Sequence, residues 1–174
     1  MDLAPVPDVT APDLRILFVG INPSSYSAQV GRHFARPGNP FWRLLHAAGL
    51  TPRLLEPQED RRLLELGLGI TNVCERPTRS AAELSSDELR DGATALRAKI
   101  EALRPRAVAL VGITLYPVVF PGRGERGPGA RRVRAGGARV YVLPNPSGLN
   151  AAFPGFKSKL RWFRRLARWV RDAR

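Results

Sequence analysis

The 174-residue chain has few residues suited to metals, disulfides or membranes. Its one cysteine, Cys74, excludes an internal disulfide and a cysteine-ligated cluster. Its two histidines, His33 and His46, add no metal-ligand spacing, so we expect no metal and no cofactor. No stretch approaches the roughly 18 apolar residues of a membrane span. The N-terminus lacks the basic and apolar parts of a signal peptide, and we therefore expect a cytoplasmic protein without a membrane partner.

Acidic residues are also scarce relative to basic ones. The chain contains 28 lysines and arginines but 15 aspartates and glutamates, which gives a net charge of +13. Lysine occurs only at positions 99, 157 and 159, so nearly all of the bases are arginine. A genome rich in G and C would explain arginine in place of lysine, but it explains the shortage of acids less well. A polyanionic partner explains the imbalance, and we expect nucleic acid.

Short apolar runs alternate with helical patterns along the chain. An apolar run that ends at a turn residue is typical of a strand buried on both faces. The expected strands are 14–20, 67–73, 107–111 and 139–143, and 131–134 is expected to pair with the last of these as a hairpin. The expected helices are 40–48, 57–66, 85–103, 112–119 and 156–172. This alternation predicts an α/β fold with a mainly parallel sheet, in one domain from residue 14 to 174 that follows a loose tail of residues 1–13.

Two strand-end loops share an Asn-Pro-Ser turn. The first, at residues 22–24, follows strand 14–20, and it is expected to continue as a long loop without a helix. The second, at residues 145–147, follows strand 139–143. The carboxyl ends of parallel strands meet at one edge of a sheet, and ligands bind in the crevice there. The two loops therefore predict one site at that edge.

Four segments, in chain order, resemble the mismatch-specific uracil/thymine-DNA glycosylase family of the uracil-DNA glycosylase superfamily. They are GINPSS (20–25), FARPGNPFW (34–42), ITN with RPT (70–72 and 76–78) and LPNPSGL (143–149). The resemblance implies a three-layer α/β/α sandwich around a four-stranded, mainly parallel sheet. It also implies a base excision repair enzyme that flips uracil, or thymine or a damaged pyrimidine, out of mismatched duplex DNA and cleaves its N-glycosidic bond. We expect preference for a base opposite guanine, and a monomer.

The resemblance gives roles to residues of the first motifs. Asn22 matches the side chain that positions the attacking water, although an amide cannot take the proton from it. Catalysis must then come largely from stabilising the uracil anion and the sugar cation, and backbone N–H groups near Ile21 and Phe34 suit the anion. The ring of Phe34 matches the aromatic that stacks on the flipped base. Ser24 stands where bacterial members often have glycine, so the substrate range is expected to differ. His33 is a candidate for contact with DNA phosphate.

The last motif is expected to contact both the flipped base and the DNA. Asn145 matches a position in the base pocket. Leu149 matches the apolar wedge that fills the gap left by the base, which offsets part of the unstacking cost. Backbone groups around Gly148 and Asn150 would read the widowed guanine. The residues expected to contact DNA are Ser147, Gly148, Leu149, Asn150, Arg76 and Lys157.

Asp91 is a second catalytic candidate. It aligns roughly with a position that is glutamate in some relatives, and it lies early in the helix 85–103. A carboxylate that reached the pocket could activate water. The alternative is a solvated surface acid, which the dipole near a helix N-terminus also stabilises.

Two other functions compete with the glycosylase. A non-catalytic nucleic-acid-binding module would use the same basic edge but would not need a water-orienting amide at Asn22. A nucleotide hydrolase would need a cluster of metal-binding carboxylates, which these motifs lack. The pocket motifs also contain no lysine, so we expect a monofunctional enzyme without a Schiff-base lyase step.

Overall fold

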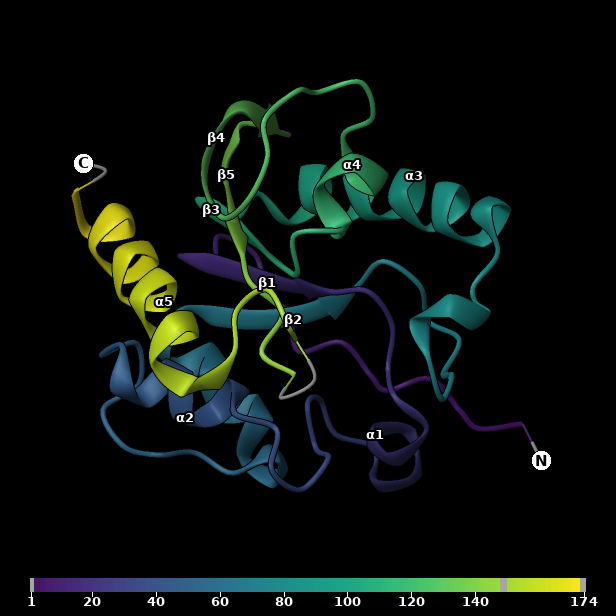
Figure 1. The fold of residues 1–174 in the computed structure, drawn as a ribbon, viewed down its shortest axis with the longest axis horizontal. Coiled ribbons are helices and arrows are strands. Elements are labelled where there is room, and N and C mark those ends of the chain that lie inside the picture. Colours follow the sequence, from purple (N-terminus) through teal and green to yellow (C-terminus); the bar gives the residue numbers. More distant parts are fainter. Residues whose placement is uncertain (1, 148–149, 173–174) are drawn as a thin grey trace.

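A five-stranded sheet forms the centre of the protein in the computed structural model, which describes residues 2–147 and 150–172 (Figure 1). The strand order is β2-β1-β3-β5-β4. The strands are β1 (Ile16–Gly20), β2 (Leu68–Asn72), β3 (Ala107–Val111), β4 (Gly129–Ala135) and β5 (Ala138–Leu143). All neighbouring pairs are parallel except β4 with β5. The predicted α/β fold with a mainly parallel sheet is therefore confirmed.

The expected number of four strands is wrong because the hairpin joins the sheet. Its first strand, β4, pairs antiparallel with β5 and becomes an edge of the sheet. Gly136 and Gly137 form the turn with φ angles of 52° and 86°, a conformation that a two-residue hairpin turn requires and that glycine adopts without steric cost. Exposed residues alternate with partly buried ones along most of β4, as expected for a strand with one solvated face.

Helices cover both faces of the sheet, so the three-layer arrangement holds (Figure 1). Successive strand residues point to opposite faces. Leu17 and Val108 face a cluster with α3 and α4, whereas Phe18 and Ala109 face a cluster with α2 and α5. The helical elements are α1 (Ser25–Val30), α2 (Phe41–Ala47), η1 (Pro57–Leu66), η2 (Ala81–Glu83), α3 (Ser86–Leu103), α4 (Leu115–Val119) and α5 (Gly155–Asp172), of which η1 and η2 are 3-10 helices.

The short helix α1 lies in the loop after β1, where the sequence predicted no helix. The Ser24 side chain accepts a hydrogen bond from the Ser27 backbone N–H at 3.1 Å, which is an N-cap interaction. Gly31, with a φ of 70°, ends the helix as its C-cap. The prediction failed because Pro23 and Ser24 are typical both of a turn and of a helix start.

Part of the segment before β1, around Val6 to Val9, is packed, which corrects the expectation of a loose tail there. Val9 is 1% exposed and pairs antiparallel with Ile70 of β2 through backbone hydrogen bonds of 3.0 and 2.8 Å. The carboxylate of Asp8 accepts a hydrogen bond from Nζ of Lys99 on α3 at 2.6 Å. These contacts satisfy backbone groups at the β2 edge and fix the N-terminal segment against it.

Candidate active site

A small cavity lies at the carboxyl ends of the parallel strands, where the two Asn-Pro-Ser loops meet. Its volume is about 160 Å³, and the last residues of β1, β2 and β3 line it together with the loops. The structure brings five of the predicted site residues into this cavity: Ile21, Asn22, Ser24, Phe34 and Asn145. Two loops that are far apart in sequence therefore form one site, as the edge rule for parallel sheets predicts.

The amide of Asn22 is fixed by two acceptors in the loop after β2. Its Nδ2 donates to the backbone carbonyl of Arg76 at 2.9 Å and to Oγ1 of Thr78 at 2.7 Å. The Thr78 hydroxyl donates to the carbonyl of Ser80 at 2.8 Å, so its oxygen can accept from Asn22. A carbonyl oxygen only accepts, so Nδ2 must face Arg76. Oδ1 of Asn22 receives no hydrogen bond from the described residues and is available to water.

Phe34 is held in an uncommon backbone conformation beside Asn22. Its φ is 49°, a left-handed value that is rare for a residue other than glycine. Its ring stacks on Phe41 of α2, with a centroid distance of 4.0 Å and an interplanar angle of 24°. The backbone N–H groups of Phe34 and Ile21 donate to no other described residue. They are therefore not used within the described chain, and the anion-binding role stays a prediction.

Ser24 and Ser27 connect the start of the loop to its far end. Oγ of Ser24 donates to Oγ of Ser27 at 3.1 Å, and the buried Ser27 hydroxyl accepts from the backbone N–H of Ala35 at 3.1 Å. These bonds hold the residue after Phe34 against α1. The Ser24 hydroxyl is also the N-cap acceptor of α1, so it serves the helix although the residue lines the cavity.

His33 is a buried wall of the cavity and not the surface residue that the sequence predicted. It is 3% exposed, and its Nε2 lies 2.8 Å from the carbonyl oxygen of Pro7. Burial lowers the pKa of this imidazole. The expected contact with DNA phosphate is therefore wrong, because the ring is enclosed and bonded to the N-terminal segment.

The second loop forms a hydrogen-bonded turn next to the cavity. Oδ1 of Asn145 accepts from the backbone N–H of Ser147 at 2.9 Å, and Nδ2 of Asn150 donates to the Asn145 carbonyl at 3.1 Å. The Oδ1 atom of Asn145 is thus used in the turn. Gly148 and Leu149 lie outside the described residues, so the wedge and the guanine-reading backbone stay predictions.

Asp91 lies in a different hollow from Asn22. This hollow has a volume of about 350 Å³ and lies between α3 and the loop after β2, where Cys74 and Arg76 also line it. The Asp91 side chain is exposed. Asn72 lines both hollows, but the structure does not bring the two proposed catalytic side chains together. The catalytic role of Asp91 stays a prediction.

The two predicted basic DNA contacts differ in how they are held. Arg76 forms a two-pronged ion pair with Glu88, with N–O distances of 2.8 and 3.0 Å, and also donates to the Glu83 carbonyl at 3.1 Å. The Arg76 guanidinium lowers the pKa of the Glu88 carboxyl. Lys157 is exposed on the first turn of α5 and pairs with no acid in the described chain. Contact of either residue with DNA stays a prediction.

Asn72, at the end of β2, is a cavity residue that was not among the predicted site residues. Its side chain has no hydrogen-bond partner among the described residues, and it packs against Gly20. A Cβ at position 20 would lie 2.6 Å from Oδ1 of Asn72, so a larger residue at position 20 would displace the amide. The edge rule could have identified Asn72, because it places the last residue of β2 beside the two loops.

The described residues show no site for a metal and no membrane span. No group of three or more histidine, cysteine or acidic side chains among them is arranged to hold a metal ion. No helix among them is both long enough and apolar enough to cross a bilayer.

Comparison with known proteins connects this cavity to a family. The family model of the uracil DNA glycosylase superfamily matches residues 7–170. The fold is also similar to the solution NMR structure of a candidate uracil DNA glycosylase from Methanosarcina acetivorans, with a TM-score of 0.60 and 24% identity over 96% of this chain and 99% of that chain. The match to the family spans most of the chain and includes both loops of the cavity. The chain therefore belongs to the uracil DNA glycosylase superfamily, whose general chemistry is hydrolysis of an N-glycosidic bond in DNA.

Proposed function

We propose that the protein is a monofunctional DNA glycosylase that excises uracil from mismatched duplex DNA, preferentially opposite guanine, in base excision repair. The observation that carries the proposal is the fixed amide of Asn22 in a cavity of base size. At about 160 Å³, the cavity is smaller than the roughly 300–1,000 Å³ of pockets for drug-sized ligands. A base must leave the duplex to enter it, because the reacting bond is inaccessible within the stack.

Asn22 would orient the water that attacks the sugar carbon. Its Oδ1 is free to accept a hydrogen bond from water, while Arg76 and Thr78 hold its Nδ2. The amide does not remove the proton. The rate enhancement would then come from two other sources: alignment of the water with the sugar, and stabilisation of the charge that develops as the base leaves.

The departing uracil carries negative charge, and backbone donors of the first loop would stabilise it. The N–H groups of Ile21 and Phe34 have no protein acceptor in the described chain, and both residues line the cavity. Donors that are fixed before the reaction need no reorganisation when the charge forms. The ring of Phe34 is held by Phe41, so a stacked base would meet a fixed aromatic surface.

Asn72 and Asn145 would recognise an edge that uracil shares with thymine and that cytosine lacks. The edge of uracil that faces away from the sugar presents an N–H donor between two carbonyl acceptors. The free amide of Asn72 offers one acceptor and two donors, so it can match a donor and an adjacent acceptor of that edge. Asn145 uses its Oδ1 in the turn, which leaves its Nδ2 as a donor toward the cavity.

The proposed preference for mismatches rests on the second loop. The proposed duplex partner rests on the charge of the protein. The motif LPNPSGL is the segment whose resemblance implies an apolar wedge and contacts with the unpaired guanine. A net charge of +13 favours a DNA duplex as the partner. We propose that a monomer acts on duplex DNA with G·U or related mismatches, in the cytoplasm next to the chromosome.

Excision from a defined set of oligonucleotides tests this proposal. The set contains one uracil opposite guanine, one opposite adenine, one thymine opposite guanine, and one uracil in a single strand. The expected result is release of uracil fastest from the G·U duplex, without a protein–DNA adduct after borohydride treatment. Binding without cleavage of any substrate would instead support the non-catalytic binding module. A borohydride-trapped adduct would contradict the monofunctional assignment.

A further inference from the structure

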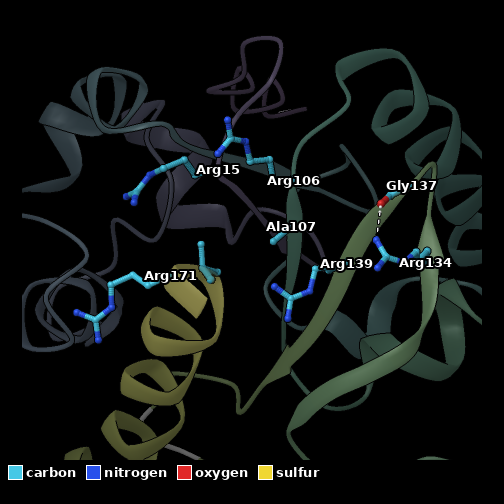
Figure 2. A pocket seen from close by; sticks show the side chains of 8 residues that line it. Arg15, Arg106, Ala107, Arg134, Gly137, Arg139 and Arg171 are labelled. Carbon is cyan, nitrogen blue, oxygen red and sulfur yellow. Dashed lines mark hydrogen bonds between the residues drawn. The ribbon is translucent and has the colours of Figure 1, made fainter. Parts of the chain in front are cut away.

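A basic hollow lies at the edge of the sheet opposite to the catalytic cavity. β1, β3 and β5 are parallel, so their amino ends share that opposite edge. The hollow lies at those amino ends and has a volume of about 640 Å³. Figure 2 shows five arginine side chains at its border, contributed by the starts of β1 and β3, by β4 and β5, and by the end of α5: Arg15, Arg106, Arg134, Arg139 and Arg171.

Neutral groups hold the guanidinium groups of this arginine hollow in place. Three of the five donate to backbone carbonyls: Arg15 to Leu66 at 3.1 Å, Arg134 to Gly137 at 3.1 Å, and Arg139 to Trp169 at 3.2 Å. None of the five forms an ion pair with a carboxylate in residues 2–147 or 150–172, and no acidic residue lines the hollow. A carbonyl orients a guanidinium but does not neutralise it. Among the described residues, the fold therefore gathers positive charge at this hollow without a counter-charge in its lining.

The side chain of Arg139 is half-buried, and its guanidinium is stacked on an aromatic ring. The guanidinium carbon lies 3.7 Å from the centre of the Trp169 ring. Burial, and secondarily the charge of Arg134, lowers the pKa of Arg139. A bound anion would raise the pKa of Arg139 and so oppose both effects. The stacking also fixes the plane of the guanidinium, which suits two-pronged binding of a phosphate.

A row of arginines extends from the hollow along α5 toward the catalytic edge. The helix α5 starts shortly after the second loop of the cavity, contains 18 residues and ends at the hollow, so it spans about 27 Å. Its exposed face carries arginines at helical spacing: Arg161, Arg164, Arg168 and Arg171. A single free phosphate would occupy a small part of this surface. An extended chain of phosphates matches both the hollow and the row.

We propose that the arginine hollow is a second DNA-binding site, which holds the phosphate backbone of a duplex segment other than the one in the catalytic cavity. Strands of five residues, about 17 Å long, separate the two edges, so the catalytic cavity and the hollow lie at opposite edges of the sheet. One protein molecule then bridges two DNA segments. This inference goes beyond the proposed excision activity, and it can be tested on undamaged DNA alone.

The test uses a triple variant and a variant matched in charge. The triple variant, Arg106→Gln with Arg134→Gln and Arg171→Gln, removes three exposed guanidinium groups but keeps the stacked Arg139. The matched control, Arg61→Gln with Arg123→Gln and Arg126→Gln, removes three exposed arginines elsewhere. Bridging is measured by energy transfer between two undamaged duplexes, one with a donor dye and one with an acceptor dye. Excision from a short uracil-containing duplex is measured in parallel.

The expected result is bridging by the wild type and the control, and loss of bridging by the triple variant. Excision from the short duplex is expected to be unchanged in both variants. The slope of the logarithm of the binding constant for a long undamaged duplex, plotted against the logarithm of salt concentration, should also become shallower in the triple variant. The expected change in slope is about 0.9 for each lost phosphate contact. These readouts do not depend on catalysis, so their failure and a failure to excise uracil are distinguishable.

Two outcomes would overturn the proposal. Equal bridging by the triple variant and the control would show that DNA does not use the hollow. The second outcome concerns small phosphates, tested with inorganic tripolyphosphate in a thermal unfolding assay. If tripolyphosphate stabilised the wild type and the control but not the triple variant, while all three bridged equally, the hollow would be a site for small phosphates and not for DNA.

Discussion

At the scale of single residues, the position of one amide atom decides whether the cavity can catalyse hydrolysis. The carbonyl of Arg76 and the hydroxyl of Thr78 both require Nδ2 of Asn22 as a donor, which leaves its Oδ1 without a partner among the described residues. The sequence motif indicated Asn22 itself. It could not indicate the partners, since they lie 54 and 56 residues away along the chain.

Thr78→Val should therefore reduce catalysis without a change at the water-orienting residue. The substitution keeps the shape of the buried side chain but removes its hydroxyl, so Asn22 loses an acceptor. Leaving a buried polar group unpaired costs about 1–3 kcal/mol, and we expect the single-turnover excision rate to fall about tenfold to a hundredfold. Thr78→Ser keeps the hydroxyl and should retain most of the rate. Equal rates for Thr78→Val and wild type would show that Thr78 does not position the amide.

His33 should make the stability of the fold depend on pH. Burial lowers the pKa of His33 in the folded protein below its unfolded value of about 6.5, so the unfolded chain binds the proton more readily. The contribution of the neutral, buried ring is complete above about pH 6.5 and is lost as the pH falls through the window below it. The free energy of unfolding, from urea titrations between about pH 5 and 7.5, should decline on acidification. His33→Gln should flatten that decline, and an unchanged slope would contradict the assignment.

At the scale of elements, the sequence predicted β1 and β3 well because each is a short, almost uniformly apolar run. β3 has the predicted bounds, and the helix α3 starts at the predicted cap, Ser85. The short helix α1 was missed because its cap residues are also turn residues. The antiparallel edge strand β4 changed the strand number, and the packed N-terminal segment was missed because its contacts with β2 and α3 are distant in sequence.

The site was predictable to the extent that it follows from loops at strand ends. Asn22, Phe34 and Asn145 meet because parallel strands end at one edge. The ion pair of Arg76 with Glu88 was not predictable from either motif, because it depends on how α3 packs beside the loop after β2. The same packing separates Asp91 from the cavity.

Asp91→Ala tests whether α3 contributes to catalysis. The side chain is exposed and borders the neighbouring hollow, so we expect the excision rate of the variant to stay within a few-fold of the wild type. The measurement is single-turnover release of uracil from the G·U duplex, with thermal unfolding as a check on folding. Loss of most of the activity in a folded variant would establish Asp91 as the acid or base that the sequence analysis considered.

At the scale of the whole molecule, the positive charge is not confined to the catalytic edge. Composition predicted a nucleic-acid partner from a net charge of +13 but could not give its distribution. The fold places five arginines in a hollow at the opposite edge and a row of arginines along α5 between the two edges. The sequence could not show this arrangement, because the five residues lie between positions 15 and 171 and converge only through the strand order.

Single-turnover excision of uracil from a G·U duplex by the wild type and Asn22→Ala tests most directly whether Asn22 makes the cavity catalytic. Gln29→Ala, which removes an exposed amide on α1, is the matched control. We predict release by the wild type and the control, and a loss of about 10²-fold or more in Asn22→Ala with duplex binding retained. Equal excision by Asn22→Ala and the wild type would contradict the account, because the cavity would then hydrolyse the bond without its fixed amide.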